Sequence, residues 1–132
     1  MNEIEKWLLK AENDLKVAKN EIQINEAPRD IICFHCQQAV EKYLKAYLVF
    51  MKQEFRKTHN ISELLKLCFD IDKSFKELKE LNVHELTIYA TEVRYPDEFY
   101  IPSLEEAREA INLAEKTKEF ILKKLKENNF KI

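Results

Sequence analysis

The stretch CFHCQQAVEKYLKAYLVFM, residues 33–51, decides the fold. Each step along an α-helix turns about 100°, so residues three or four apart share a face. A wide apolar face contains Cys36, Ala39, Val40, Tyr43, Leu44, Tyr47 and Met51. A narrow opposite stripe contains His35, Gln38, Lys42 and Lys45. The pattern predicts a helix that is mostly buried and has one organised polar edge.

Helical patterns continue on both sides of this stretch. Helices are expected over about Asn2–Gln23, from near Pro28 to about Gln53, from Asn60, over Asp70–Leu81, from Asn82 to about Val93, and from Ser103 to about Glu127. At positions 2, 60, 82 and 103, Asn or Ser is followed three residues later by Glu, which indicates a helix N-terminus. No alternating run bounded by hairpin turns predicts a strand. The sequence therefore predicts an all-α protein, an up-and-down antiparallel bundle of four long helices plus one short helix, in a single domain over residues 1–132.

The composition limits the classes of function. Apolar residues make up 45 % and charged residues 35 % of 132 residues, which is typical of one folded domain. The net charge of −2 provides no overall basic field for holding nucleic acid. The chain has no glycine, which argues against tight turns with positive φ and excludes P-loop and dinucleotide-binding fingerprints. Asn25 and Asn82 are expected to take the place of glycine at helix ends.

Cysteine usage favours a cytoplasmic protein. Cys33, Cys36 and Cys68 are an odd number with no disulfide pattern, which favours reduced thiols. The charged N-terminus shows no signal peptide, and the longest apolar run, Tyr47–Met51, is too short to cross a membrane. Cys33-x-x-Cys36 lacks the second ligand pair of a structural zinc site, so neither a metal nor a cofactor is expected. His35 and Cys36 are adjacent and point apart, which argues against a Cys-His nucleophile.

Three motifs resemble those of a known family. Residues 34–46, FHCQQAVEKYLKA, resemble the F-x-x-QQA-x-EK-x-LKA signature of HEPN domains (higher eukaryotes and prokaryotes nucleotide-binding). Residues 58–65, THNISELL, resemble the TH-x-L-x-x-L segment of that family. Residues 94–97, RYPD, match an element of one prokaryotic stand-alone branch. The order and spacing of the motifs fit nearly the whole chain.

The resemblance implies an all-α bundle that is usually a homodimer. Such proteins often act beside a minimal nucleotidyltransferase, as its partner or substrate-binding subunit, and some pairs are toxin and antitoxin. Toxic members are metal-independent ribonucleases, in which Arg is followed after four to six residues by His near the start of the last long helix. Two copies of that pair meet across the dimer.

The catalytic pair of the family is incomplete in this chain. At the required spacing from Arg94 stand Phe99, Tyr100 and Ile101, none of which is His. Arg29 and His35 have the spacing but lie in the second helix, so we interpret that match as chance. Cleavage of RNA through its 2′-OH needs an acid and a base near pH 7, whereas the ordinary pKa of tyrosine is about 10.

The segment TEVRYPDEFYIPS, residues 91–103, is the second candidate region. Pro96 disfavours helical geometry at Tyr95, so a helix is expected to end near Arg94. The Arg94 guanidinium offers a rigid fork for phosphate or carboxylate, and Tyr95 and Tyr100 offer ring faces for a base. The alternative interpretation is structural: Arg94 pairs with Asp97 or Glu41 and fixes the loop.

The sequence therefore supports several hypotheses. In the first, a non-catalytic homodimer binds nucleotide or RNA and partners a minimal nucleotidyltransferase. The ligand-binding residues are then His35, Gln38, Lys42, Lys45, His59, Arg94, Tyr95 and Asp97. The alternative is a ribonuclease toxin of a toxin-antitoxin pair with a degenerate site at Arg94 and Tyr100. A third hypothesis is a structural dimer without a ligand, in which the polar stripe is only solvated and His59 only begins a helix.

Overall fold

The computed structural model describes residues 1–90 and 100–131. Its elements are α1 (Glu3–Glu21), α2 (Arg29–Phe50), α3 (Ile61–Ile71), the 3₁₀ helix η1 (Lys73–Phe75), α4 (Lys76–Glu80), the 3₁₀ helix η2 (Val83–Tyr89) and α5 (Leu104–Glu127). The described residues contain no strand, so the prediction of an all-α bundle is confirmed for this part of the chain. None of the described helices is long and apolar enough to span a membrane.

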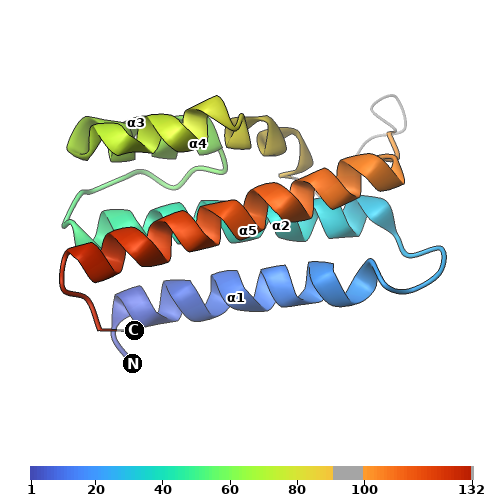
Figure 1. Ribbon diagram of the computed structural model, residues 1–132, viewed down its shortest axis with the longest axis horizontal. Coiled ribbons are helices and arrows are strands. Elements are labelled where there is room, and N and C mark those ends of the chain that lie inside the picture. Colours follow the sequence, from blue (N-terminus) through green and yellow to red (C-terminus); the bar gives the residue numbers. More distant parts are fainter. Residues whose placement is uncertain (91–99, 132) are drawn as a thin grey trace.

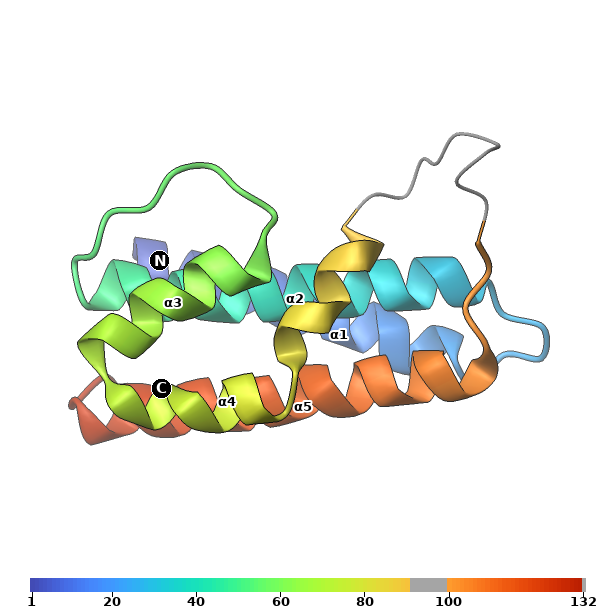
Figure 2. The ribbon, with the colours of Figure 1, turned by 90° about the horizontal axis from the view of Figure 1, so that it is seen from above.

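The long helix α2 is the centre of the bundle. It contacts α1, α3, α5 and η2. Figures 1 and 2 show α1, α2 and α5 side by side, while α3, α4 and η2 cover one side of them. The connection formed by residues 52–60 doubles back along α2 before α3 begins (Figure 2). As a result, α5 runs antiparallel to α1 and parallel to α2 (Figure 1).

Contacts at both ends of the bundle confirm this parallel arrangement. At one end, Arg29 Nε at the start of α2 donates to the Pro102 carbonyl just before α5, at 2.7 Å. At the other end, the ring of Phe50 packs against that of Phe130, with centroids 5.6 Å apart. The N-termini of α2 and α5 therefore meet, although the two helices are far apart in the sequence.

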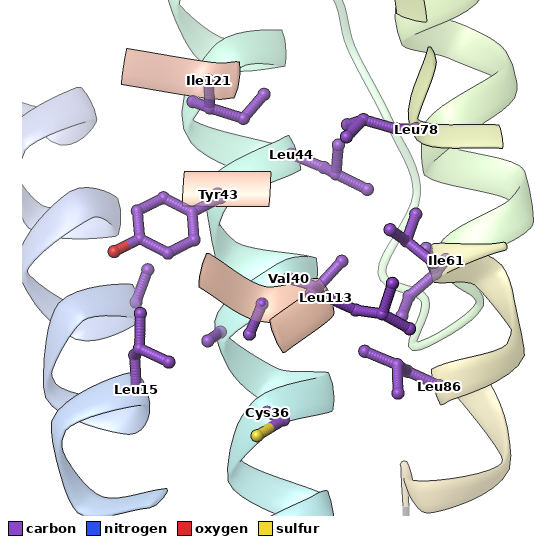
Figure 3. Packing of buried hydrophobic residues seen from close by; sticks show 14 of the residues in the cluster. Leu15, Cys36, Val40, Tyr43, Leu44, Ile61, Leu78, Leu86, Leu113 and Ile121 are labelled. Carbon is purple, nitrogen blue, oxygen red and sulfur yellow. The ribbon is translucent and has the colours of Figure 1, made fainter. Parts of the chain in front are cut away.

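One apolar core joins all the elements. Figure 3 shows Leu15 of α1, Leu44 of α2 and Leu78 of α4 within the same interior. The residues predicted on the apolar face of α2 are buried, except Met51, which is half-buried. The hydroxyl of Tyr43 reaches towards α1 (Figure 3) and donates to Glu12 Oε2 at 2.8 Å. The wide apolar face of α2 thus supports helices on several sides, as burial of a nearly complete helix requires.

Local capping fixes the predicted starts of three helices. Asn2 with Glu5 and Ser103 with Glu106 form complete capping boxes. The Asn60 side chain accepts a hydrogen bond from the Glu63 amide. In each case a side-chain oxygen satisfies an amide that the helix leaves without a partner.

The predicted N-cap at Asn82 is wrong. Asn82 adopts the left-handed conformation with φ of 62° and caps no helix through its side chain. Instead it follows the last turn of α4, which agrees with the expected use of Asn82 in place of glycine. The segment after it is the 3₁₀ helix Val83–Tyr89 rather than an α-helix, and Val93 lies outside the described residues.

The expectation that, without glycine, positive φ occurs only at asparagines replacing it at helix ends is wrong at two positions, Glu26 and Lys52. Positive φ occurs at Glu26, Lys52, Asn82 and Asn129. Near the end of α1, Glu26 has this conformation rather than the expected Asn25. After α2, the Lys52 amide donates to the Val49 carbonyl at 3.0 Å and the Gln53 amide to the Leu48 carbonyl at 2.9 Å. These bonds form a Schellman motif, which holds a lysine in a conformation that usually favours glycine.

The strain at Lys52 generates a stability prediction. Lys52→Gly removes the steric cost of a β-carbon at a φ of 57° and is expected to raise the free energy of unfolding by about 0.5–1 kcal/mol. Lys16→Gly, at an exposed position within α1, is the matched control and should lower it by about 1 kcal/mol. Chemical denaturation measures both. A lower stability for both variants contradicts the prediction.

Candidate functional site

The polar stripe of α2 divides into two clusters, and the first faces α1. His35 Nδ1 lies 2.8 Å from Asp14 Oδ1, and Lys42 Nζ lies 2.5 Å from Asp14 Oδ2. The Asp14 side chain is 12 % exposed. One carboxylate of α1 therefore engages two of the predicted ligand-binding side chains and joins the two helices.

The second cluster surrounds Glu41. Its carboxylate accepts hydrogen bonds from Gln37 Nε2 at 2.9 Å and from Lys45 Nζ at 2.5 Å. His59 Nδ1 lies 3.1 Å from Glu41 Oε2. Gln38 Nε2 donates to Gln37 Oε1 at 2.7 Å. The cluster thus contains three more of the predicted ligand-binding residues, Gln38, Lys45 and His59.

Two aromatic rings lie near the Lys45 ammonium in this cluster. Lys45 Nζ lies 5.4 Å from the ring centroid of Trp7 and 6.0 Å from that of Phe55. Burial raises the pKa of Glu41, but the hydrogen bonds from Lys45, His59 and Gln37 outweigh this effect and leave the pKa of Glu41 below its ordinary value. The Glu41 cluster therefore holds an ionised carboxylate inside the protein and connects α1, α2 and the segment 52–60.

The pairing of these side chains changes the interpretation of the stripe. The side chains of His35 and Lys42 are 22 % and 21 % exposed, and that of Lys45 is 9 % exposed. Their polar atoms bond to carboxylates of the same chain. Ligand binding by this stripe stays a prediction, and the contacts assign the stripe a role in packing α1 and the segment 52–60 against α2.

An open groove lies at the end of the bundle where α2 and α5 begin. It has a volume of about 450 Å³ and is lined by two arginines, Arg29 and Arg108, and by one carboxylate, Glu26. The rest of the lining is polar or apolar and includes Gln23, Asn25, Ile32 and Leu104. The bond to Pro102 uses the Nε–H of Arg29, one of the five donors of a guanidinium. Two arginine side chains from different helices therefore meet at one groove, which we call the arginine groove.

Between Leu104 and Arg108 of the groove, α5 carries a carboxylate that accepts hydrogen bonds from two tyrosine hydroxyls. Glu106 accepts a hydrogen bond from the Tyr89 hydroxyl at 3.0 Å and from the Tyr100 hydroxyl at 2.5 Å. The bond from Tyr100 lowers the pKa of Glu106, and the same bond raises the pKa of Tyr100. Tyr100 is 46 % exposed, so its ring is accessible to solvent while its hydroxyl donates a hydrogen bond to Glu106.

Several predicted site residues lie outside the described residues. These are Arg94, Tyr95 and Asp97. Arg29 and His35, the second pair with the family spacing, lie on the same helix. Six residues correspond to about 9 Å along the axis and about 120° around it, so the two side chains leave α2 in different directions. Accordingly, Arg29 contacts the segment before α5, whereas His35 contacts α1.

The remaining nucleophiles are poorly suited to catalysis. Cys33, Cys36 and Cys68 are free and buried. Burial raises the pKa of Cys33 to about 12 and also raises the pKa of Cys36 and of Cys68. Among the described residues, no group of three His, Cys, Asp or Glu side chains is placed to hold a metal ion.

Sequence reasoning missed three important residues. Asp14 stands among Ala11, Leu15 and Ala18 on the buried face of α1, and a charged residue in an apolar stripe is the signal that could have identified it. The Ser103 capping box located Glu106, but nothing in the sequence indicated its two tyrosine donors. Arg108 gave no signal, because its proximity to Arg29 depends on the parallel arrangement of α2 and α5.

The Glu41 cluster generates a prediction about stability and pH. Glu41→Gln leaves Lys45 buried without its carboxylate and should lower the free energy of unfolding by about 3 kcal/mol at neutral pH. Because the pKa of Glu41 is lower in the folded protein, its contribution is complete above the ordinary value of 4.5 and is lost as pH falls through the folded value. The difference in free energy of unfolding between the wild type and Glu41→Gln should therefore become smaller below pH 4.5.

Denaturant unfolding of both proteins at several pH values, from neutral to acidic, measures this difference in stability. Glu63→Gln is the matched control, because Glu63 pairs with an Arg56 side chain that is 71 % exposed, and it should cost less than about 1 kcal/mol. The assigned role of Glu41 is contradicted if Glu41→Gln and Glu63→Gln lower the free energy of unfolding equally. It is also contradicted if the difference between the wild type and Glu41→Gln grows as the pH falls.

Comparisons with known proteins bear on these features. Residues 4–125 match the HEPN domain family. An archaeal HEPN homologue, ST0689, has a similar crystal structure, with a TM-score of 0.72 and 27 % identity over 95 % of this chain and 99 % of that chain. The protein TT1696 from Thermus thermophilus is similar as well, with a TM-score of 0.73 and 30 % identity over 95 % of this chain and 100 % of that chain. No curated protein matches.

The family match covers the α1–α2 pair with its Asp14 and Glu41 clusters, the α3–η2 segment and nearly all of α5. The two solved structures share the arrangement of these helices over almost their full lengths. The chain therefore belongs to the HEPN domain family.

Proposed function

We propose that this HEPN-domain protein is a non-catalytic accessory subunit that binds nucleotide or RNA phosphate and partners a minimal nucleotidyltransferase. The observation that carries the proposal is the arginine groove, in which Arg29 and Arg108 line a space of about 450 Å³. Guanidinium groups bind phosphate in a bidentate geometry that lysine does not match. The volume lies within the range of small-molecule sites, roughly 300–1,000 Å³.

Neighbouring side chains suit the rest of such a ligand. Tyr100 lies two residues before Pro102, whose carbonyl holds Arg29, and its exposed ring offers a face on which a base can stack. Arg94, predicted from sequence to offer a further guanidinium, precedes Tyr100 by six positions. A phosphate held by arginines beside an aromatic ring is a mode of binding single-stranded nucleic acid and nucleotides.

The chemistry of the side chains argues for binding without cleavage. Acid–base cleavage of RNA needs groups that exchange protons near pH 7. The Tyr100 hydroxyl donates to Glu106, which raises the pKa of Tyr100 and makes it a poor base. His35 and His59 are engaged by Asp14 and Glu41. The described residues therefore give no sign of an acid and base beside the arginine groove.

A homodimer and a nucleotidyltransferase partner complete the proposal. Both follow from the family resemblance. The dimer has support from exposed apolar side chains at the arginine-groove end, since Tyr100, Ile101 and Leu104 are 46 %, 52 % and 42 % exposed. Sequencing the region around the gene for this chain tests the partnership: a neighbouring gene for a minimal nucleotidyltransferase would support it, and its absence would argue against it.

RNA binding tests the arginine groove. With a labelled oligouridylate, fluorescence anisotropy should show saturable binding that weakens from about 50 to about 200 mM salt, because phosphate contacts release counterions. Arg29→Ala and Arg108→Ala should each weaken binding about tenfold and reduce the salt slope by about 0.7. Arg29→Lys should also weaken binding, because it loses the planar fork. Arg94→Ala extends the test to the predicted loop arginine.

Lys10→Ala is the matched control, since Lys10 is exposed on α1 away from the groove, and its affinity should equal that of the wild type. Unchanged affinity in both groove variants overturns the proposal. Gel electrophoresis of the same samples with a chelator distinguishes the alternative function, a metal-independent ribonuclease toxin. Intact RNA is expected. Cleavage that is lost in Arg94→Ala and Tyr100→Phe establishes the ribonuclease instead.

Light scattering tests the dimer. The wild type should have twice the chain mass of 15.8 kDa. Ile101→Asp should give the monomer mass, because it places a charge in the exposed apolar group before α5. Leu9→Asp, at an equally exposed position on α1, should leave the dimer intact. A wild-type mass of 15.8 kDa, or dissociation by Leu9→Asp alone, contradicts the proposed surface.

A further inference from the structure

A second groove of about 360 Å³ lies between α3 and the elements η1, α4 and η2. We call it the α3–α4 groove. Its apolar lining comes from Leu65, Phe69 and Phe75. Leu65 and Phe75 are buried and belong to the core, whereas Phe69 is half-buried and forms part of the wall. The volume suits a small organic molecule, since such sites enclose roughly 300–1,000 Å³.

The aromatic side chains of this groove are held in place by their neighbours. The Phe75 ring packs between those of Tyr47 and Phe120, with centroids 4.7 Å and 4.8 Å away. Lys73 Nζ lies 4.4 Å from the centroid of the Phe69 ring. The apolar surface is therefore formed before any ligand arrives, which reduces the entropy that binding must overcome.

Two lysines at the groove have no ion-pair partner within the described residues: Lys79, which lines it, and Lys73, whose ammonium lies over the Phe69 ring. Lys66 Nζ pairs with Asp70 Oδ2 at 3.1 Å, so these two charges cancel. Lys79 and His84 also line the groove, and within the described residues neither side chain has a hydrogen-bond or ion-pair partner. The Lys73 ammonium is directed at the Phe69 ring, so the Lys79 ammonium and the His84 imidazole are the groups of the lining that remain for an anion, and together they complement one carboxylate.

We propose that the α3–α4 groove binds a small aromatic carboxylate. Its ring packs against Phe69 at the wall of the groove, which the buried Phe75 supports from behind, and its carboxylate accepts hydrogen bonds from Lys79 and His84. This site is separate from the arginine groove, because the two share no lining residue. Its ligand carries a single charge, so it also differs in chemistry from the phosphate ligand proposed for that groove.

A titration of the full chain with 1-naphthoate, followed by amide NMR, tests the proposal. Saturable shifts are expected at residues of α3, α4 and η2. Lys79→Ala should weaken binding at least about fivefold, because it removes a charge-assisted hydrogen bond. The uncharged analogue 1-naphthalenemethanol should bind the wild type more weakly than 1-naphthoate and should not distinguish Lys79→Ala from the wild type.

Two further variants keep the test decisive. Lys123→Ala removes an exposed lysine of α5 outside this groove and should bind like the wild type. Ser62→Trp fills the groove from an exposed position of α3 without altering the core and should abolish binding. The proposal is overturned if the wild type shows no saturable shift at the solubility limit of the probe, or if Lys79→Ala and Ser62→Trp bind as tightly as the wild type.

Discussion

The buried carboxylate of Glu41 is the constraint on which the rest of the structure depends. An ionised group inside a protein costs several kcal/mol unless its oxygens are bonded. Lys45 and Gln37 supply bonds from the same helix, and His59 supplies one from the segment 52–60. Gln37 also donates to the His59 carbonyl at 3.1 Å. Satisfying this carboxylate therefore fixes the path of the chain after α2.

The path of segment 52–60 determines where the later helices can lie. Because His59 is held against the middle of α2, α3 begins there rather than beyond the end of α2 (Figure 2). The elements from α3 to η2 then cover one side of the long helices, and Tyr89 at the end of η2 donates a hydrogen bond to Glu106 in the first turn of α5. α5 begins at the end where α2 starts and runs parallel to α2, which brings Pro102 to Arg29 and forms the arginine groove.

Local signals made most of the helices predictable from sequence, whereas contacts between helices were not predictable. The capping boxes at Asn2 and Ser103 involve residues three apart, so the sequence contains all that they need. Asn82 was ambiguous, because it fits both an N-cap and a left-handed helix end, and burial of Leu78 and Val83 on either side favours the second. The polar stripe on α2 was predicted, but its carboxylate partner on α1, Asp14, was not. This pairing depends on how the two helices align, and a local sequence pattern does not predict that alignment.

The motif that identifies the family and the proposed ligand-binding groove occupy different parts of the molecule. The signature on α2 supplies the apolar face, Gln37, Glu41 and Lys45, all of which pack or bond within the chain. It therefore specifies the bundle, and a chain can keep it whether or not it cleaves RNA. The groups that we propose to bind a ligand lie instead where α2 and α5 begin, and surface connections generally vary more in sequence than the core does. In this chain the segment 91–103 contains arginine and tyrosine but no histidine, and this composition is one basis of the proposal that the protein binds RNA or nucleotide without cleaving it.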